Sequence, residues 1–82
     1  MTVSLRFLCV DIPIGLGNGD ISIDEGTTIE DILIFSREQY GIELPLTELK
    51  KSLFLVNSNP ARLDYTLMDK DMLSIVRPLA GG

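Results

Sequence analysis

The sequence has no histidine, no tryptophan and a single cysteine, Cys9, among its 82 residues. Without a second cysteine no disulfide can form within the chain, and without histidine the ligand spacings typical of zinc sites are missing. Cys9 also lacks a histidine that would activate it as a nucleophile, so we expect it to be a small core residue. The composition therefore argues against a metal site and against a catalytic cysteine.

Long apolar runs and an excess of positive charge are missing as well. No stretch approaches the roughly 20 residues that cross a bilayer, and the N-terminal segment lacks the pattern of a signal peptide. Seven basic against twelve acidic residues give a net charge of -5, which disfavours binding to nucleic-acid phosphates. We expect a cytoplasmic protein with no membrane and no nucleic-acid partner. Its acidity either attracts a basic protein surface or serves solubility alone.

What is present has the length of one small domain. Apolar residues alternate over 3–9 and again over 21–23, which predicts two strands. The glycine-rich segment DIPIGLGNGD between them predicts a loop, and a hairpin is the simplest pairing of the two strands. This loop has neither the Lys-Ser/Thr ending of a P-loop nor the spacing of a dinucleotide-binding fingerprint.

The segment GTTIEDILIFSREQYG changes to helical spacing. Thr28 is the expected N-cap, and Asp31 completes a variant of the capping box. Ser36 falls on the apolar stripe, and Gly41 is placed to end the helix. The apolar members of the stripe are Ile29, Ile32, Leu33 and Tyr40.

The second half predicts two more strands, LFLVN and MLSIV, separated by the turn NSNP and a short irregular segment. Thr47 is the expected cap of one helical turn before them. Asp69 and Asp71 could be paired carboxylates for acid–base work, but a tight turn explains them better. The order predicts an α+β roll, with one helix across a mixed sheet of about four strands. A right-handed crossover would place the last strand parallel to the first, at the sheet centre.

The last residues, RPLAGG, differ from the rest. We expect a folded domain over 1–76 and an extended tail over 77–82, which Pro78 stiffens. Gly81 and Gly82 lack Cβ atoms and can thread a channel too narrow for other residues. A free carboxylate is a poor electrophile, so the carboxylate of Gly82 would need activation as an acyl-adenylate to react.

Three segments, LRFLCVDIPIGLG, GTTIEDIL and VNSNPARLDYTLMDKDMLSIVRPLAGG, resemble the β-grasp sulfur carriers of the MoaD/ThiS type. The most specific parts are LMDKDMLSIV and the terminal PLAGG. The resemblance covers essentially the whole chain and implies a ubiquitin-like β-grasp fold with a mixed sheet of four to five strands. It implies a carrier rather than an enzyme, with no bound cofactor. Gly82 would be adenylated by an ATP-dependent adenylyltransferase of the ubiquitin-activating type and converted to a thiocarboxylate. The residues that would thread the partner's active site are Arg77, Pro78, Leu79, Ala80 and Gly81.

The resemblance also implies a sulfur-accepting synthase: the large subunit of molybdopterin synthase or, next, thiazole synthase of the thiamine pathway. Two departures bear on the pathway. The molybdopterin carriers usually read Pro-Pro-Val where this chain has Arg77, Pro78 and Leu79, and Lys70 replaces the glycine of an Asp-Gly-Asp turn. Two alternatives stay open: a ubiquitin-like modifier conjugated to lysines through Gly82, and an interaction domain with an inert tail.

The strand patterns also predict a docking patch at the root of the tail. Leu8 points away from Phe7 in the first strand, and Val76 points away from Ile75 in the last. Leu55 is the third candidate, although its facing is ambiguous from the pattern. If the first and last strands are neighbours, these side chains form an exposed apolar patch, which usually marks a partner site.

Overall fold

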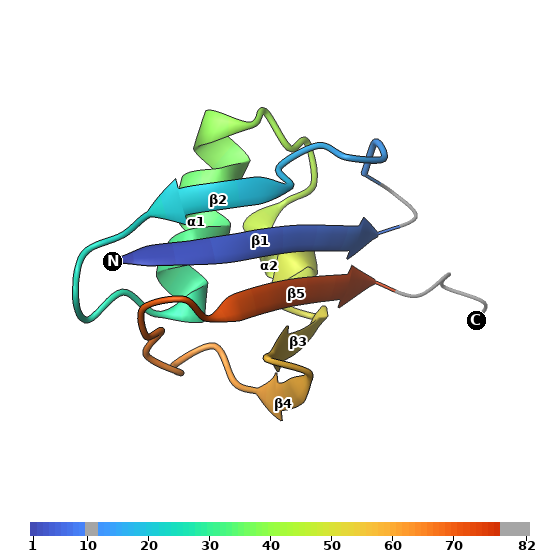
Figure 1. The fold of residues 1–82 in the computed structure, drawn as a ribbon. Helices are drawn as coiled ribbons and strands as arrows, with labels where there is room; N and C mark the ends of the chain where they lie inside the picture. Colours follow the sequence, from blue (N-terminus) through green and yellow to red (C-terminus); the bar gives the residue numbers. More distant parts are fainter. Residues whose placement is uncertain (10–11, 78–82) are drawn as a thin grey trace.

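The computed structural model describes residues 1–9 and 12–77. The described elements form one five-stranded sheet with two helices on one side (Figure 1). They are β1 (Thr2–Cys9), β2 (Gly19–Ser22), α1 (Ile29–Gln39), α2 (Leu46–Leu49), β3 (Leu53–Val56), β4 (Asn59–Ala61) and β5 (Met72–Arg77). The strand order is β2-β1-β5-β3-β4. β5 is parallel to β1 and the other neighbours are antiparallel, so the expected hairpin, central parallel pair and mixed sheet are confirmed.

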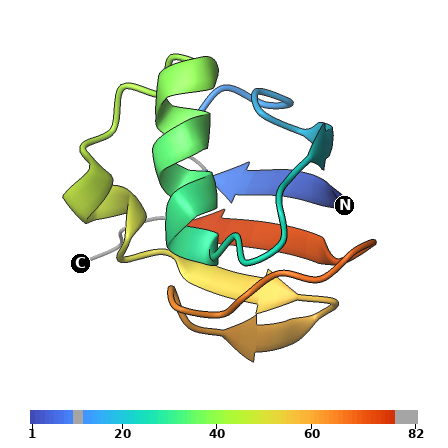
Figure 2. The ribbon, with the colours of Figure 1, turned by 90° about the vertical axis from the view of Figure 1, so that its left-hand side faces the viewer.

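Helix α1 lies across one face of the sheet (Figure 2). The predicted capping box is present: Thr28 Oγ1 accepts a hydrogen bond from the Asp31 N–H (3.3 Å), and Asp31 Oδ2 accepts one from the Thr28 N–H (3.0 Å). The helix ends at Gln39 with Tyr40 as its C-cap. Gly41 follows with φ of 65°, a conformation that glycine adopts without strain. Local sequence signals therefore fix both ends of α1.

The core lies between α1 and the inner face of the sheet. Alternate residues of β1 and β5 face α1 and are buried, and the residues between them face outward on the open side. The buried apolar side chains are Val3, Leu5, Phe7, Ile12, Ile29, Ile32, Leu33, Ile42, Leu49, Phe54, Val56, Leu67, Leu73 and Ile75. Cys9 packs half-buried against this core, and its thiol donates to the Ile75 carbonyl (3.4 Å). This is the structural role expected for it.

Two local predictions were wrong. The turn expected over NSNP comprises only Asn57 and Ser58, with φ of 52° and 71°, which fits a two-residue hairpin turn. The chain then forms the three-residue strand β4, which includes Pro60. The N-cap of α2 is Pro45 rather than Thr47. Proline lacks an N–H, so it suits a helix start, where that group has no partner within the helix.

The carboxylates of Asp69 and Asp71 stabilise the turn before β5. Asp71 is only 7% exposed, and its carboxylate accepts hydrogen bonds from the Met68 N–H (2.8 Å) and Asn57 Nδ2 (2.9 Å). Asp69 accepts one from a main-chain N–H of β1 (2.8 Å). Lys70 between them has φ of 69°. These bonds occupy both carboxylates in structural roles, as the turn interpretation predicted.

Candidate functional site

The root of the tail lies at the end of β5, beside the end of β1. The strand includes Arg77, one residue beyond the expected boundary at 76, and Arg77 is paired in register with Cys9. The Arg77 side chain is only 16% exposed; its Nη1 donates to the Glu48 carbonyl, and its Nη2 lies 3.9 Å from Glu48 Oε2. Helix α2 therefore holds the last described residue of the chain and fixes where the tail begins.

The other predicted tail residues, Pro78, Leu79, Ala80, Gly81 and Gly82, lie outside the described part of the chain. Their expected roles in threading and activation stay predictions. The described structure supplies the frame from which this tail continues, namely the β1 and β5 ends and α2.

The predicted docking residues Leu8, Leu55 and Val76 share the face of the sheet opposite α1. In register, Leu8 of β1 neighbours Val76 of β5, which in turn neighbours Leu53 of β3. Leu8 is 47% exposed and Leu53 is 50% exposed, whereas Leu55 and Val76 are half-buried. We call these four residues, Leu8, Leu53, Leu55 and Val76, the outer-face patch. The sheet thus assembles it from three strands, directly at the root of the tail.

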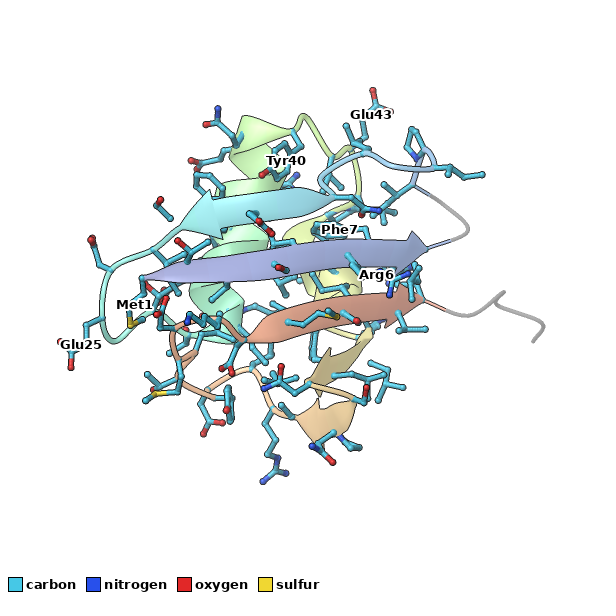
Figure 3. The ribbon with its side chains drawn as sticks, in the orientation of Figure 1. Met1, Arg6, Phe7, Glu25, Tyr40 and Glu43 are labelled. Atoms are coloured by element: carbon cyan, nitrogen blue, oxygen red, sulfur yellow. The ribbon has the colours of Figure 1, made fainter. Side chains whose placement is uncertain are left out.

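Sequence reasoning missed Leu53 and also Arg6, which lies on the same face (Figure 3). Arg6 is exposed and neighbours Ser74 in register, and Ser74 neighbours Leu55. The alternation that turns Phe7 inward and Leu8 outward turns Arg6 outward as well. A positive charge beside an apolar patch can pair with an acidic group on a docking partner, which favours orientation more than affinity.

A metal site and a membrane-spanning helix receive no support from the described residues. Within residues 1–9 and 12–77, no three His, Cys, Asp or Glu side chains come together as candidate metal ligands. No described helix is long and apolar enough to cross a membrane. We take the outer-face patch with the neighbouring tail root as the candidate site, because exposed apolar side chains gather there.

The model of the ThiS family matches residues 16–82, which is most of the chain. The chain belongs to the ThiS family. Together with its fold, this membership makes it a β-grasp protein of the MoaD/ThiS sulfur-carrier type. The match extends through the last residue and so includes the Gly-Gly ending. A search of the curated proteins found no match.

Three solved structures share the fold of this ThiS-family chain. A putative molybdopterin converting factor subunit 1 from Pyrococcus furiosus has a TM-score of 0.66 at 15% identity, over 96% of this chain and 99% of that one. SAMP1 from Haloferax volcanii has a TM-score of 0.71 at 17% identity, over 100% of both chains. A chain from the complex of subunits 1 and 2 of the Helicobacter pylori molybdopterin-converting factor has a TM-score of 0.60 at 20% identity, over 100% of both. At such identities the likeness shows the ubiquitin-like β-grasp fold alone.

Proposed function

We propose that this ThiS-family protein carries sulfur as a thiocarboxylate on Gly82. The observation that carries the proposal is the family match through Gly82, on a chain whose last described strand ends at Arg77. In this proposal residues 78–82 carry the reactive carboxylate into the active site of the partner. The protein acts as a carrier and cosubstrate, not as an enzyme by itself, and the ATP is used by its activating enzyme.

The chemistry needs two steps in partner active sites. First, a carboxylate oxygen of Gly82 attacks the α-phosphorus of ATP, forming the acyl-adenylate and releasing pyrophosphate. A sulfide-level sulfur nucleophile then attacks the acyl carbon and AMP leaves, which yields the thiocarboxylate. Gly81 and Gly82 have no side chains, so the arm can pass close to the backbone of the partner and hold the acyl carbon in place.

The outer-face patch is the surface on which we place the partners. Leu8 and Leu53 are about half exposed, and covering such side chains stabilises a complex by about 1 kcal/mol each. The two molybdopterin-converting-factor neighbours, one of them in a complex of subunits 1 and 2, support a large-subunit synthase as the sulfur acceptor. We therefore favour molybdopterin biosynthesis, then thiamine biosynthesis. The cytoplasmic location expected from the sequence is a separate part of the proposal.

Adenylation tests this proposal directly. The full chain, its cognate activating enzyme and ATP should release pyrophosphate and give a protein heavier by one AMP moiety. A matched variant with one extra residue after Gly82 should keep the same unfolding temperature and give no adenylate, because its terminal carboxylate is displaced. Adenylation of both proteins, or of neither, would contradict a role for the Gly82 carboxylate.

A ubiquitin-like modifier joined to lysines through Gly82 is the second candidate. The likeness to SAMP1 is consistent with it, but at 17% identity that likeness shows the fold alone. The two functions share the adenylate and differ in the next step. Conjugates on lysine side chains, without sulfur entering another pathway, would favour the modifier.

A further inference from the structure

The outer side of β2 is an open edge of the sheet. β2 pairs with β1 on one side, and no strand among the described residues pairs with its other side. The Ile23 N–H donates to the Met1 carbonyl (2.7 Å) and the Met1 amino group donates to the Ile23 carbonyl (3.2 Å). Because main-chain groups alternate in direction along an antiparallel strand, those of Ser22 and Asp20 point away from β1. This edge therefore presents main-chain donors and acceptors to an incoming strand.

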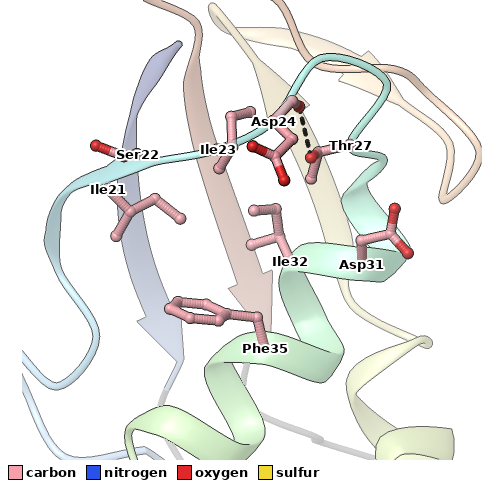
Figure 4. A pocket seen from close by; sticks show the side chains of 8 residues that line it. All are labelled: Ile21, Ser22, Ile23, Asp24, Thr27, Asp31, Ile32 and Phe35. Carbon is pink, nitrogen blue, oxygen red and sulfur yellow. Dashed lines mark hydrogen bonds between the residues drawn. The ribbon is translucent and has the colours of Figure 1, made fainter.

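An apolar cleft adjoins this edge, between β2 and α1 (Figure 4). Its volume is about 290 Å³, at the lower end of the range of small-molecule pockets, about 300–1,000 Å³. Ile21 and Ile23 line it from the β2 side, and Ile32 and Phe35 line it from α1. Phe35 is 41% exposed, and its ring meets that of Tyr40 edge to face at 6.0 Å. The cleft suits one or two apolar side chains of a peptide.

The rim of the cleft is acidic. Asp24 and Asp31 line it, and its described lining contains no lysine or arginine. Both aspartates are exposed, as is Glu25, which follows Asp24 in the sequence. The Asp31 carboxylate caps α1, whereas the Asp24 main-chain carbonyl, rather than its side chain, accepts from Thr27. The Asp24 carboxylate is thus available to a cationic side chain.

The opposite edge strand, β4, has a feature that disfavours strand addition and that β2 lacks. Val56 and Asn59 flank the two-residue turn and are partners in register, as are Leu55 and Pro60. By the same alternation, the main-chain nitrogen of Pro60 faces outward. Proline has no N–H to donate there, a common protection against strand addition. β2 contains no proline.

We propose that the β2 edge and its cleft bind an extended segment of a partner protein by strand addition. The segment pairs with the main chain of Asp20 and Ser22, and it places one or two apolar side chains against Phe35 and Ile32. A lysine or arginine of the segment lies beside Asp24. Main-chain pairing supplies affinity, and the cleft and the charge supply specificity. The surface does not include Arg77 or the outer-face patch, so it acts independently of the tail chemistry.

Amide chemical shifts of the full, isotope-labelled chain test this proposal. The probe is a short synthetic peptide with isoleucine at alternate positions and lysine at both ends, and the comparison peptide carries glutamate in place of lysine. The lysine peptide should shift the amides of Asp20, Ser22 and Phe35 and slow hydrogen exchange at Ser22. Shifts confined to Leu8 and its neighbours, equal binding of both peptides, or no shift at millimolar peptide would overturn the proposal.

Three variants locate the contact. Ser22→Pro removes an outward N–H without removing a bond to β1, so it should abolish peptide binding. Should that variant fail to fold, Phe35→Ala tests the cleft. Asp24→Lys should weaken binding about threefold to tenfold, whereas the matched change Asp64→Lys, outside the cleft, should not. Equal effects of the two lysine variants would contradict the predicted charge contact. If the chain forms a dimer and Ser22→Pro abolishes that dimer, the β2 edge binds a second copy of this chain rather than a segment of a partner protein.

Discussion

At the scale of single residues, Ser36 is a polar side chain on the otherwise apolar buried stripe of α1. Its side chain is fully buried, and its Oγ has no hydrogen-bond partner within the described residues. A buried hydroxyl without a partner is destabilising. Ser36→Ala should therefore stabilise the domain by about 1 kcal/mol and raise the midpoint of thermal unfolding by about 4–8 °C. Gln39→Ala, exposed on the same helix, controls for helix propensity, and a lower midpoint for Ser36→Ala would contradict this assignment.

Lys70 offers a second test at this scale. Its φ of 69° lies in the left-handed region, which costs a non-glycine residue roughly 1–2 kcal/mol. Part of this is offset by the greater entropy of glycine in the unfolded chain. Lys70→Gly should then stabilise the domain by about 0.5 kcal/mol, measured by denaturant unfolding. Lys70→Ala removes the same charge but keeps a Cβ, so stabilisation by both variants would point to charge rather than backbone strain.

At the scale of elements, the outer-face patch joins three strands, and its substitutions should separate binding from folding. Leu8→Gln and Leu53→Gln replace half-exposed side chains, so each should weaken binding to the activating enzyme about fivefold or more with little change in unfolding temperature. Met68→Gln is the matched control, because Met68 is 60% exposed and lies in the turn before β5. Titration calorimetry gives the affinities. Unchanged binding of both leucine variants would remove the patch from the mechanism.

Elements whose signals are local could be predicted from the sequence, and elements that depend on distant pairing could not. Thr28 and Asp31 mark the start of α1 within four residues, and the alternation in β1 shows which side chains enter the core. β4 escaped prediction because three residues around Pro60 carry no strand pattern and are held by β3. The Arg77–Glu48 contact joins residues 29 positions apart, so no spacing rule reveals it. Leu53 joined the patch only through its register with Val76.

At the scale of the whole molecule, the acidic domain has two separate candidate binding surfaces. The outer-face patch and the tail root lie at the ends of β1 and β5, whereas the β2 cleft lies between that edge strand and α1. The net charge of -5 should speed encounter with basic partners at low salt. Under the two proposals above, the tail would enter one partner while the β2 edge contacts another.

Conversion of Gly82 to a thiocarboxylate changes the mass of the intact protein, so mass spectrometry of the full chain detects it. The full chain is incubated with its cognate activating enzyme, ATP and sulfide, and the product is weighed and fragmented. We expect a mass gain equal to sulfur replacing one oxygen, located at Gly82 and absent when ATP is omitted. Unchanged mass with an active cognate enzyme, or sulfur located at Cys9 instead of Gly82, would contradict this expectation.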